Sequence, residues 1–116
     1  MKKLSIVIPV YNEQATILSI LDKLLEVKLI GGLKKELVLV NDNSTDQSEN
    51  LILSFKKRHP KTNILYQKHA KNKGKGAALN TGFKIATGDI IIVQDADLEY
   101  DPYEFNRLLK PILDGF

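Results

Sequence analysis

Four short apolar segments alternate along this chain with longer segments in which apolar residues recur every three or four positions. The short segments have the length of β-strands and lie at residues 4–10, 36–40, 64–66 and 90–93. The longer segments have the spacing of amphipathic helices. Strands that alternate with helices form right-handed crossovers between parallel neighbours. The pattern therefore predicts an α/β domain with Rossmann-like βαβ repeats, in which helices cover both faces of a parallel sheet.

Apolar faces and end signals define the first two predicted helices. The first spans residues 13–28, and its inward face is Ile17, Ile20, Leu21, Leu24 and Leu25. The second carries Leu51, Ile52 and Phe55 inward and ends at residues 59–60. Its start offers three N-cap residues, which are Ser44, Thr45 and Asp46.

The third predicted helix spans residues 74–87, with Leu79, Phe83 and Ala86 spaced for one face. The strand at residues 90–93 is apolar without alternation, which is typical of a strand covered on both faces. A last helix is predicted to start at the cap Asp101 with Pro102 in its first position. Pro111 is expected to kink or end it.

The length of 116 residues fits one domain. The absence of cysteine excludes disulfides and thiolate metal sites and is typical of a reducing compartment. No apolar run approaches the roughly 20 residues of a transmembrane helix. We therefore expect a soluble chain in the cytoplasm, or on the cytoplasmic face of a membrane through other parts of a longer protein. The net charge of +3 does not identify a partner, and no nucleic-acid partner is expected.

Polar residues follow each predicted strand, at the edge where open parallel sheets bind their ligands. Acidic side chains follow the first, second and fourth strands, within residues 9–13, 41–46 and 95–97. The loop after the third strand, residues 71–76, is basic and contains glycine. This layout is typical of a site that binds a metal ion and a phosphate group.

Asp95 and Asp97 directly follow the apolar strand at residues 90–93, where carboxylates without partners would be costly. Mg²⁺ or Mn²⁺ uses one or two such carboxylates and completes its octahedral shell with substrate phosphates and water. The pair is therefore a candidate metal site. The alternative is that both residues serve the turn before the helix that Asp101 begins.

The other loops leave alternatives open. Asp42 is placed to accept a hydrogen bond from a base or ribose, or else to start the next helix as a turn residue. The loop at residues 73–76 lacks P-loop spacing but can bring N–H groups and a lysine to an anion; otherwise it is a solvated basic loop.

Asn43 fits a left-handed turn. Tyr11 is a stacking or a structural residue, and His59 and His69 are interpreted as ordinary surface residues.

Taken together, these loops resemble the family 2 glycosyltransferases, which have the glycosyltransferase-A fold. The resemblance spans residues 4–115, and residues 72–102 look most like the dolichyl- or polyprenyl-phosphate mannosyl- and glucosyltransferase branch. Its most specific segments are residues 8–13, 40–46, 72–76 and 94–99.

The resemblance implies a role for each matching residue. Pro9, Tyr11 and Glu13 would line the base and ribose pocket. Asp42 would bind the base, and Lys75 would approach the diphosphate. Asp95 and Asp97 would hold Mg²⁺ or Mn²⁺, with Asp95 also beside the nucleotide and with Gln94 and Glu99 next to them. The implied reaction, part of cell-envelope biosynthesis, transfers a sugar from a UDP- or GDP-sugar to an acceptor such as a polyprenyl phosphate, with inversion.

The sequence departs from the family at two points. Asn43 stands where glycine is usual. Family members also continue past the equivalent of residue 116 with an acceptor-binding half, which carries the carboxylate base where the acceptor is a hydroxyl. The resemblance therefore implies that residues 1–116 are a truncated nucleotide-sugar-binding domain. We expect no catalytic base within it and no sugar transfer by the isolated chain.

Three other functions remain to be compared. A nucleotide-binding or regulatory module without transferase activity would show the same loops. A dinucleotide-dependent oxidoreductase is disfavoured because no Gly-x-Gly-x-x-Gly follows the first strand. A phospho-acceptor receiver domain would need an acidic pair after the first strand and an aspartate after the third, and the aspartates here follow the second and fourth.

Overall fold

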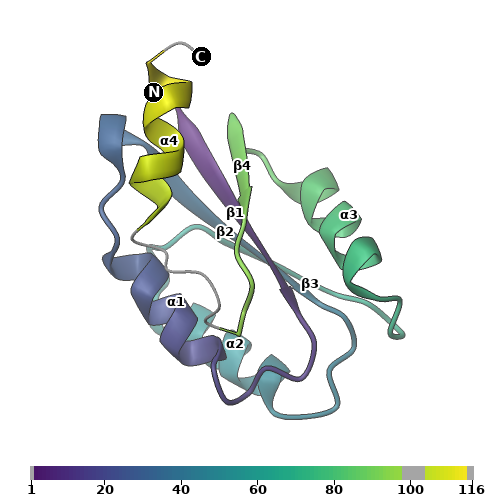
Figure 1. Cartoon of the computed structure of the whole chain (residues 1–116). Coiled ribbons are helices and arrows are strands. Elements are labelled where there is room, and N and C mark those ends of the chain that lie inside the picture. Colours follow the sequence, from purple (N-terminus) through teal and green to yellow (C-terminus); the bar gives the residue numbers. More distant parts are fainter. Residues whose placement is uncertain (1, 98–103, 115–116) are drawn as a thin grey trace.

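The computed structural model describes residues 2–97 and 104–114 (Figure 1). Its centre is a parallel four-stranded sheet in the order β3-β2-β1-β4, which confirms the predicted sheet. The strands are β1 (Lys3–Val10), β2 (Lys34–Asn41), β3 (Ile64–Lys68) and β4 (Ile90–Val93). Each lies within two residues of its predicted bounds, because continuous apolar runs mark buried parallel strands clearly.

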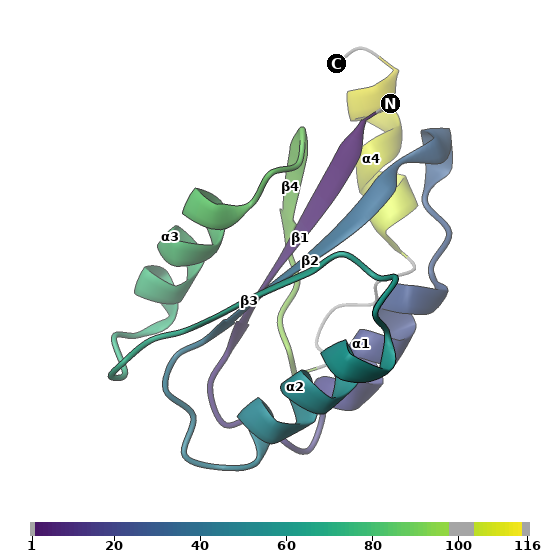
Figure 2. The ribbon, with the colours of Figure 1, turned by 180° about the vertical axis from the view of Figure 1, so that it is seen from behind.

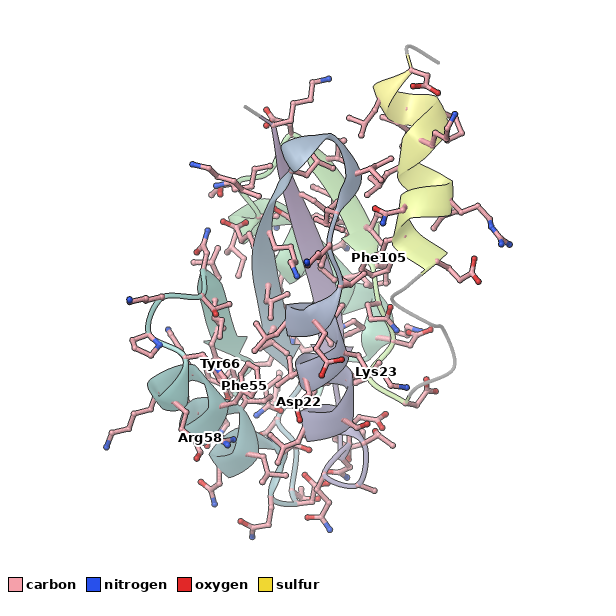
Figure 3. The ribbon with its side chains drawn as sticks, turned by 90° about the vertical axis from the view of Figure 1, so that its left-hand side faces the viewer. Asp22, Lys23, Phe55, Arg58, Tyr66 and Phe105 are labelled. Carbon is pink, nitrogen blue, oxygen red and sulfur yellow. The ribbon has the colours of Figure 1, made fainter. Side chains whose placement is uncertain are left out.

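Helices cover both faces of the sheet, as predicted (Figures 1 and 2). The first face carries α1 (Ile17–Glu26), α2 (Ser48–Arg58) and α4 (Phe105–Leu113), with the short 3₁₀ turn η1 (Ile30–Gly32) beside α4. Among the described residues, α3 (Lys75–Ile85) is the one helix on the opposite face. The buried rings of Phe55 and Phe105 belong to the larger core on the first face (Figure 3).

Alternation along β1 divides the core into two layers. Leu4, Ile6 and Ile8 belong to the larger layer under α1, α2 and α4. Val7 belongs to the smaller layer, together with Val38, Val40 and Ala78.

Helix α3 packs on its layer through small residues. A Cβ atom at Gly82 would lie 2.4 Å from Cγ1 of Val7, so only glycine permits this close approach. Ala78 and Gly82 are the buried residues of α3, whereas Phe83 is 43% exposed. The prediction that Phe83 faces inward is therefore wrong. Apolar spacing identified the helix, but small residues decided which side touches the sheet.

Strand β4 differs from its prediction on one face. Ile91 and Val93 are 42% and 39% exposed, so the expectation that both faces are covered is wrong here. Val93 is in register with Val7, which places both on the α3 side of the sheet. Helix α3 contacts β1 and β2, and within the described residues β4 is an edge strand.

The helix ends agree only partly with the sequence signals. Helix α1 starts at Ile17 rather than at residue 13, because Glu13 first forms a turn whose carbonyl accepts the N–H of Thr16 at 3.1 Å. The N-cap of α2 is Gln47, so the prediction of a cap at Ser44, Thr45 or Asp46 is wrong. Asp46 lies one residue earlier, and its Oδ1 accepts the N–H of Ser48, the first helical residue, at 2.8 Å. Ser44 and Thr45 bind the loop after β1 instead.

The last helix runs through its proline. Helix α4 continues past Pro111 to Leu113, and the N–H of Asp114 still reaches the carbonyl of Lys110 at 2.9 Å, so Pro111 does not end the helix. The proposed cap at Asp101 and Pro102 lies outside the described residues. Among the described residues, no helix has the length and apolar character needed to cross a membrane.

A buried carboxylate connects β1, β2 and the residue Thr87 at the amino end of the sheet. Glu36 of β2 is 1% exposed, and its oxygens accept hydrogen bonds from Ser5 Oγ at 2.7 Å and from the N–H of Thr87 at 2.9 Å. Lys3 Nζ lies 3.4 Å from the same carboxylate. Burial opposes ionisation, but the bonds from Thr87, Ser5 and Lys3 outweigh it and lower the pKa of Glu36 to about 2.

Candidate functional site

A cleft of about 340 Å³ opens at the carboxyl ends of the strands. It is bordered by the loops after β1, β2 and β4 and by the start of α3. Every site residue predicted from the sequence lines this cleft: Pro9, Tyr11, Glu13, Asp42, Lys75, Asp95 and Asp97. The remaining lining residues are Val10, Asn72, Gly74, Ala78 and Ala96. The parallel topology thus brings together residues that are up to 88 positions apart, from Pro9 to Asp97 (97 − 9).

The loops after β1 and β2 are bound to each other along one wall of the cleft. Asn12 is central, since its N–H donates to Ser44 Oγ at 3.0 Å and its Oδ1 accepts the N–H of Thr45 at 2.8 Å. Asn43 has φ 60°, so the predicted left-handed turn is confirmed; Asn12, with φ 53°, is a second such residue that the sequence analysis did not identify. These bonds hold Tyr11, which is 47% exposed, at the mouth of the cleft.

Asp42 is buried and already holds the neighbouring loop. Its Oδ1 accepts the N–H of Lys73 at 2.9 Å, and its Oδ2 accepts the N–H of Gly74 at 2.8 Å. Burial opposes ionisation of this carboxyl group, but the hydrogen bonds from His69, Lys73 and Gly74 prevail and lower its pKa. Asp42 is therefore an ionised group that borders the cleft and shapes the loop before α3.

His69 is not the surface residue predicted from the sequence. It is 6% exposed, with Nδ1 at 2.8 Å from Oδ1 of Asp42 and Nε2 at 2.8 Å from Oγ1 of Thr81. The interpretation was wrong because a single histidine without ligand spacing carries no local signal. Its position directly after β3, at the ligand edge of the sheet, was the available clue.

Helix α3 begins at the cleft. Gly74 has φ 95° and precedes the first helical residue, Lys75. Lys75 Nζ lies 2.6 Å from Oδ1 of Asp95, so the side chain predicted to approach a diphosphate pairs here with a predicted metal ligand. A cationic group therefore lies beside Asp95 in this structure.

Three carboxylates line the cleft close to one another, those of Glu13, Asp95 and Asp97, and Asp46 lies near them. Burial raises the pKa of Glu13, a hydrogen bond from Thr16 opposes the rise, and the negative charges of Asp97, Asp46 and Asp95 add to it. Thr16 Oγ1 also donates to the carbonyl of Ala96 at 2.5 Å, which fixes the Asp95–Asp97 turn against α1.

The donor set suits a hard divalent cation. Asp95 and Asp97 supply the carboxylate oxygens that Mg²⁺ and Mn²⁺ prefer, and substrate phosphates with water can complete the shell. Within residues 2–97 and 104–114, no group of three acidic or histidine side chains forms a complete cage. Gln94, buried beside Asp95, donates to its carbonyl at 3.0 Å, and Glu99 lies outside the described residues.

Comparison with known proteins gives a family match and similar relatives. The family model described as glycosyl transferase family 2 matches residues 5–116. An undecaprenyl-phosphate 4-deoxy-4-formamido-L-arabinose transferase from Photorhabdus laumondii is 35% identical over 115 residues, which are 99% of this chain and 35% of the relative. A protein of the same description from Yersinia pestis is 36% identical with the same coverage. The chain thus spans about a third of the length of these relatives.

Solved structures agree with this relationship. The mannosyltransferase PcManGT from Pyrobaculum calidifontis, in complex with GDP-Man and Mn²⁺, is 29% identical with a TM-score of 0.78, covering 89% of this chain and 30% of that one. The S. aureus protein TarS, residues 1–349 in complex with UDP, is 25% identical with a TM-score of 0.81, covering 97% and 32%.

A third structure contains both a metal ion and a nucleotide. Glucosyl-3-phosphoglycerate synthase from Mycobacterium tuberculosis, in complex with Mn²⁺, UDP and phosphoglyceric acid, is 28% identical with a TM-score of 0.74. The match covers 98% of this chain and 40% of that one. The parallel fold, the acidic cleft at its carboxyl edge and a family match over nearly the whole chain lead to one conclusion: the chain belongs to glycosyl transferase family 2.

Proposed function

We propose that this chain is the nucleotide-sugar-binding domain of a metal-dependent glycosyltransferase. The observation that carries the proposal is the single cleft that gathers every predicted site residue at the carboxyl edge of the sheet. Its volume of about 340 Å³ lies within the range of small-molecule sites. A nucleoside diphosphate sugar, either UDP- or GDP-linked, fits both walls of the cleft: its base and ribose fit one wall, and its diphosphate fits the other.

The wall formed by the loops after β1 and β2 receives the base and ribose. Tyr11 offers an exposed ring at the mouth, and Pro9 contributes an apolar surface. Asp42 and Glu13 supply carboxylate oxygens, which accept hydrogen bonds from base N–H groups or ribose hydroxyls. The left-handed Asn12 and Asn43 keep this wall in place before a ligand arrives.

The wall formed by β4 and α3 receives the diphosphate. Asp95 and Asp97 would hold Mg²⁺ or Mn²⁺, which neutralises charge on a departing nucleoside diphosphate. Lys75, at the start of α3, offers an ammonium group to the same phosphates once it leaves Asp95. The bound PcManGT structure, with GDP-Man and Mn²⁺, supports this assignment by similarity.

The acceptor proposed for the full enzyme is a polyprenyl phosphate. The support is that two relatives are undecaprenyl-phosphate 4-deoxy-4-formamido-L-arabinose transferases, together with the sequence resemblance to polyprenyl-phosphate transferases. Transfer occurs with inversion, and its setting is the cytoplasmic face of a membrane. No catalytic base is assigned to this chain.

Calorimetric titration tests the donor site. The chain should bind UDP-sugars or GDP-sugars in the presence of Mn²⁺ and lose most of that affinity with EDTA. NAD⁺ serves as the control ligand, because its diphosphate joins an adenosine to the C5 atom of a ribose and not to the anomeric carbon of a sugar. Equal binding of NAD⁺, or no binding of either nucleotide sugar, contradicts the proposal. Transfer is tested separately by the formation of a lipid-linked sugar from radiolabelled donor and polyprenyl phosphate.

A further inference from the structure

The buried contact between His69 and Asp42 has no part in the roles assigned above. His69 follows β3 directly, and its backbone N–H donates to the carbonyl of Asn41 at 2.8 Å. This bond extends the pairing of β2 and β3 by one residue. The backbone of His69 is therefore held by the sheet, which fixes the point from which its side chain extends. The side chain is 5% exposed.

The imidazole connects three separate elements. Nδ1 lies 2.8 Å from Oδ1 of Asp42, at the end of β2, and Nε2 lies 2.8 Å from Oγ1 of Thr81, on α3. An ionised carboxylate only accepts hydrogen bonds, so Nδ1 carries the hydrogen of the bond to Asp42. The threonine hydroxyl can donate or accept, so both ring nitrogens are satisfied.

Asp42 in turn fixes the loop that opens α3. Its oxygens accept the N–H groups of Lys73 and Gly74 at 2.9 and 2.8 Å, and its carbonyl accepts from Asn72 Nδ2 at 3.3 Å. Gly74 has φ 95°, a conformation that few side chains adopt, and it starts the helix that presents Lys75 to the cleft. The Asp42 carboxylate therefore holds the backbone of the loop that leads into α3.

We propose that His69 is a positioning residue for nucleotide binding. It orients the Asp42 carboxylate and, through it, holds the loop at residues 72–75 in the arrangement that receives the nucleoside diphosphate. This inference rests on the proposed function. His69 touches neither the ligand nor the metal site; it acts as outer partners of site carboxylates do elsewhere, by fixing a group that lines the cleft.

Two substitutions separate the contacts of the ring. The amide nitrogen of asparagine takes the place of Nδ1, so His69→Asn keeps a donor for Asp42 and loses the contact with Thr81. The amide nitrogen of glutamine takes the place of Nε2, so His69→Gln keeps a partner for Thr81 and removes the donor from Asp42. Both variants are polar, which limits the loss of folding stability that His69→Ala would bring.

Two measurements are made on the full 116-residue chain. The first is amide hydrogen exchange at Lys73 and Gly74 without ligand, which reports whether Asp42 holds the loop. The second is the Kd for UDP and GDP with Mn²⁺, by calorimetry. His69→Gln should exchange faster at both amides and bind about tenfold more weakly, because a buried acceptor loses its donor. His69→Asn should lie close to the wild type in both.

His59 supplies the matched control, since it is the other of the chain's two histidines and packs on Phe55 outside the cleft. His59→Asn and His59→Gln should change neither measurement. Faster exchange or weaker binding in His69→Asn than in His69→Gln overturns the inference, and so does wild-type behaviour of both. Wild-type chain that binds no nucleotide overturns the proposed function, whereas amide exchange still decides whether His69 holds the loop.

Discussion

Glu36 and Glu13, at opposite ends of this sheet, have opposite electrostatic settings. At the amino end, Glu36 is surrounded by donors, and its pKa falls to about 2. At the carboxyl end, burial raises the pKa of Glu13, and the charges of Asp97, Asp46 and Asp95 raise it further against the bond from Thr16. The ionised form is thus favoured at Glu36 and disfavoured at Glu13, whereas Asp42, also at the carboxyl end, is held ionised by its donors.

The difference shows which end serves the fold and which is available to a ligand. Glu36 joins Ser5 of β1 to Thr87, which follows α3, and so it closes the amino end. The negative charges of Asp97, Asp46 and Asp95 act on Glu13, so a cation brings this group a favourable interaction, as Lys75 does for Asp95. Substitutions at the two ends should therefore separate binding from stability.

The largest effect is expected for Asp97→Ala. Removing this exposed carboxylate should abolish Mn²⁺-dependent binding of UDP- and GDP-sugars, because one of two proposed metal ligands is lost. The free energy of unfolding should change by less than about 1 kcal/mol, as for most surface substitutions. Calorimetry and urea denaturation measure the two quantities. Unchanged affinity contradicts the metal role of Asp97.

Glu36→Gln should have the opposite profile. Breaking a buried, hydrogen-bonded carboxylate should lower the free energy of unfolding by about 3 kcal/mol, because Lys3 loses its partner charge. Nucleotide affinity of the folded fraction should stay within about twofold. Glu104→Gln is the control, since the exposed pair of Glu104 with Arg107 contributes less than about 1 kcal/mol. Equal stability losses in both variants exclude a special role for Glu36.

Lowering the pH from 4.5 to 2 should remove the contribution of Glu36 to the free energy of unfolding. The folded pKa of Glu36 is about 2, below its ordinary value of 4.5, so its contribution is fully present above pH 4.5. The contribution declines as pH falls below 4.5 and is lost once pH passes below 2. Urea denaturation at stepped pH measures it. The wild type should lose roughly 3 kcal/mol more than Glu36→Gln across this window; parallel curves contradict the assignment.

Helix α3 runs between the two ends of the sheet. The smallest loss of stability is expected from a change in how α3 packs on the sheet. Gly82→Ala should cost about 1–3 kcal/mol, because the new methyl group would lie 2.4 Å from Val7. Gly76→Ala is the matched control in the same helix, where a Cβ meets nothing within 4 Å. It should be neutral or stabilise by up to about 1 kcal/mol. Thermal denaturation of both variants checks the contrast, and equal effects would contradict the close packing of α3.

Much of the candidate site could be predicted from the sequence because parallel topology is a strong constraint. Once β1 and β4 are identified, Tyr11 and Asp97 must lie at the same edge of the sheet. Buried polar contacts could not be predicted in this way. The partners of His69 and of Glu36 lie on elements that are distant in the sequence. Hydrophobic periodicity does not predict such contacts.

The sequence by itself determined the α/β class, the strand positions and the set of residues at the ligand edge, because hydrophobic periodicity and strand direction are local properties. Tertiary structure alone decided which face of α3 touches the sheet, why β4 exposes Ile91 and Val93, and what surrounds His69. Those outcomes depend on distances between elements. The clearance at Gly82 and the hydrogen bonds of Asp42 exist only after the strands have paired.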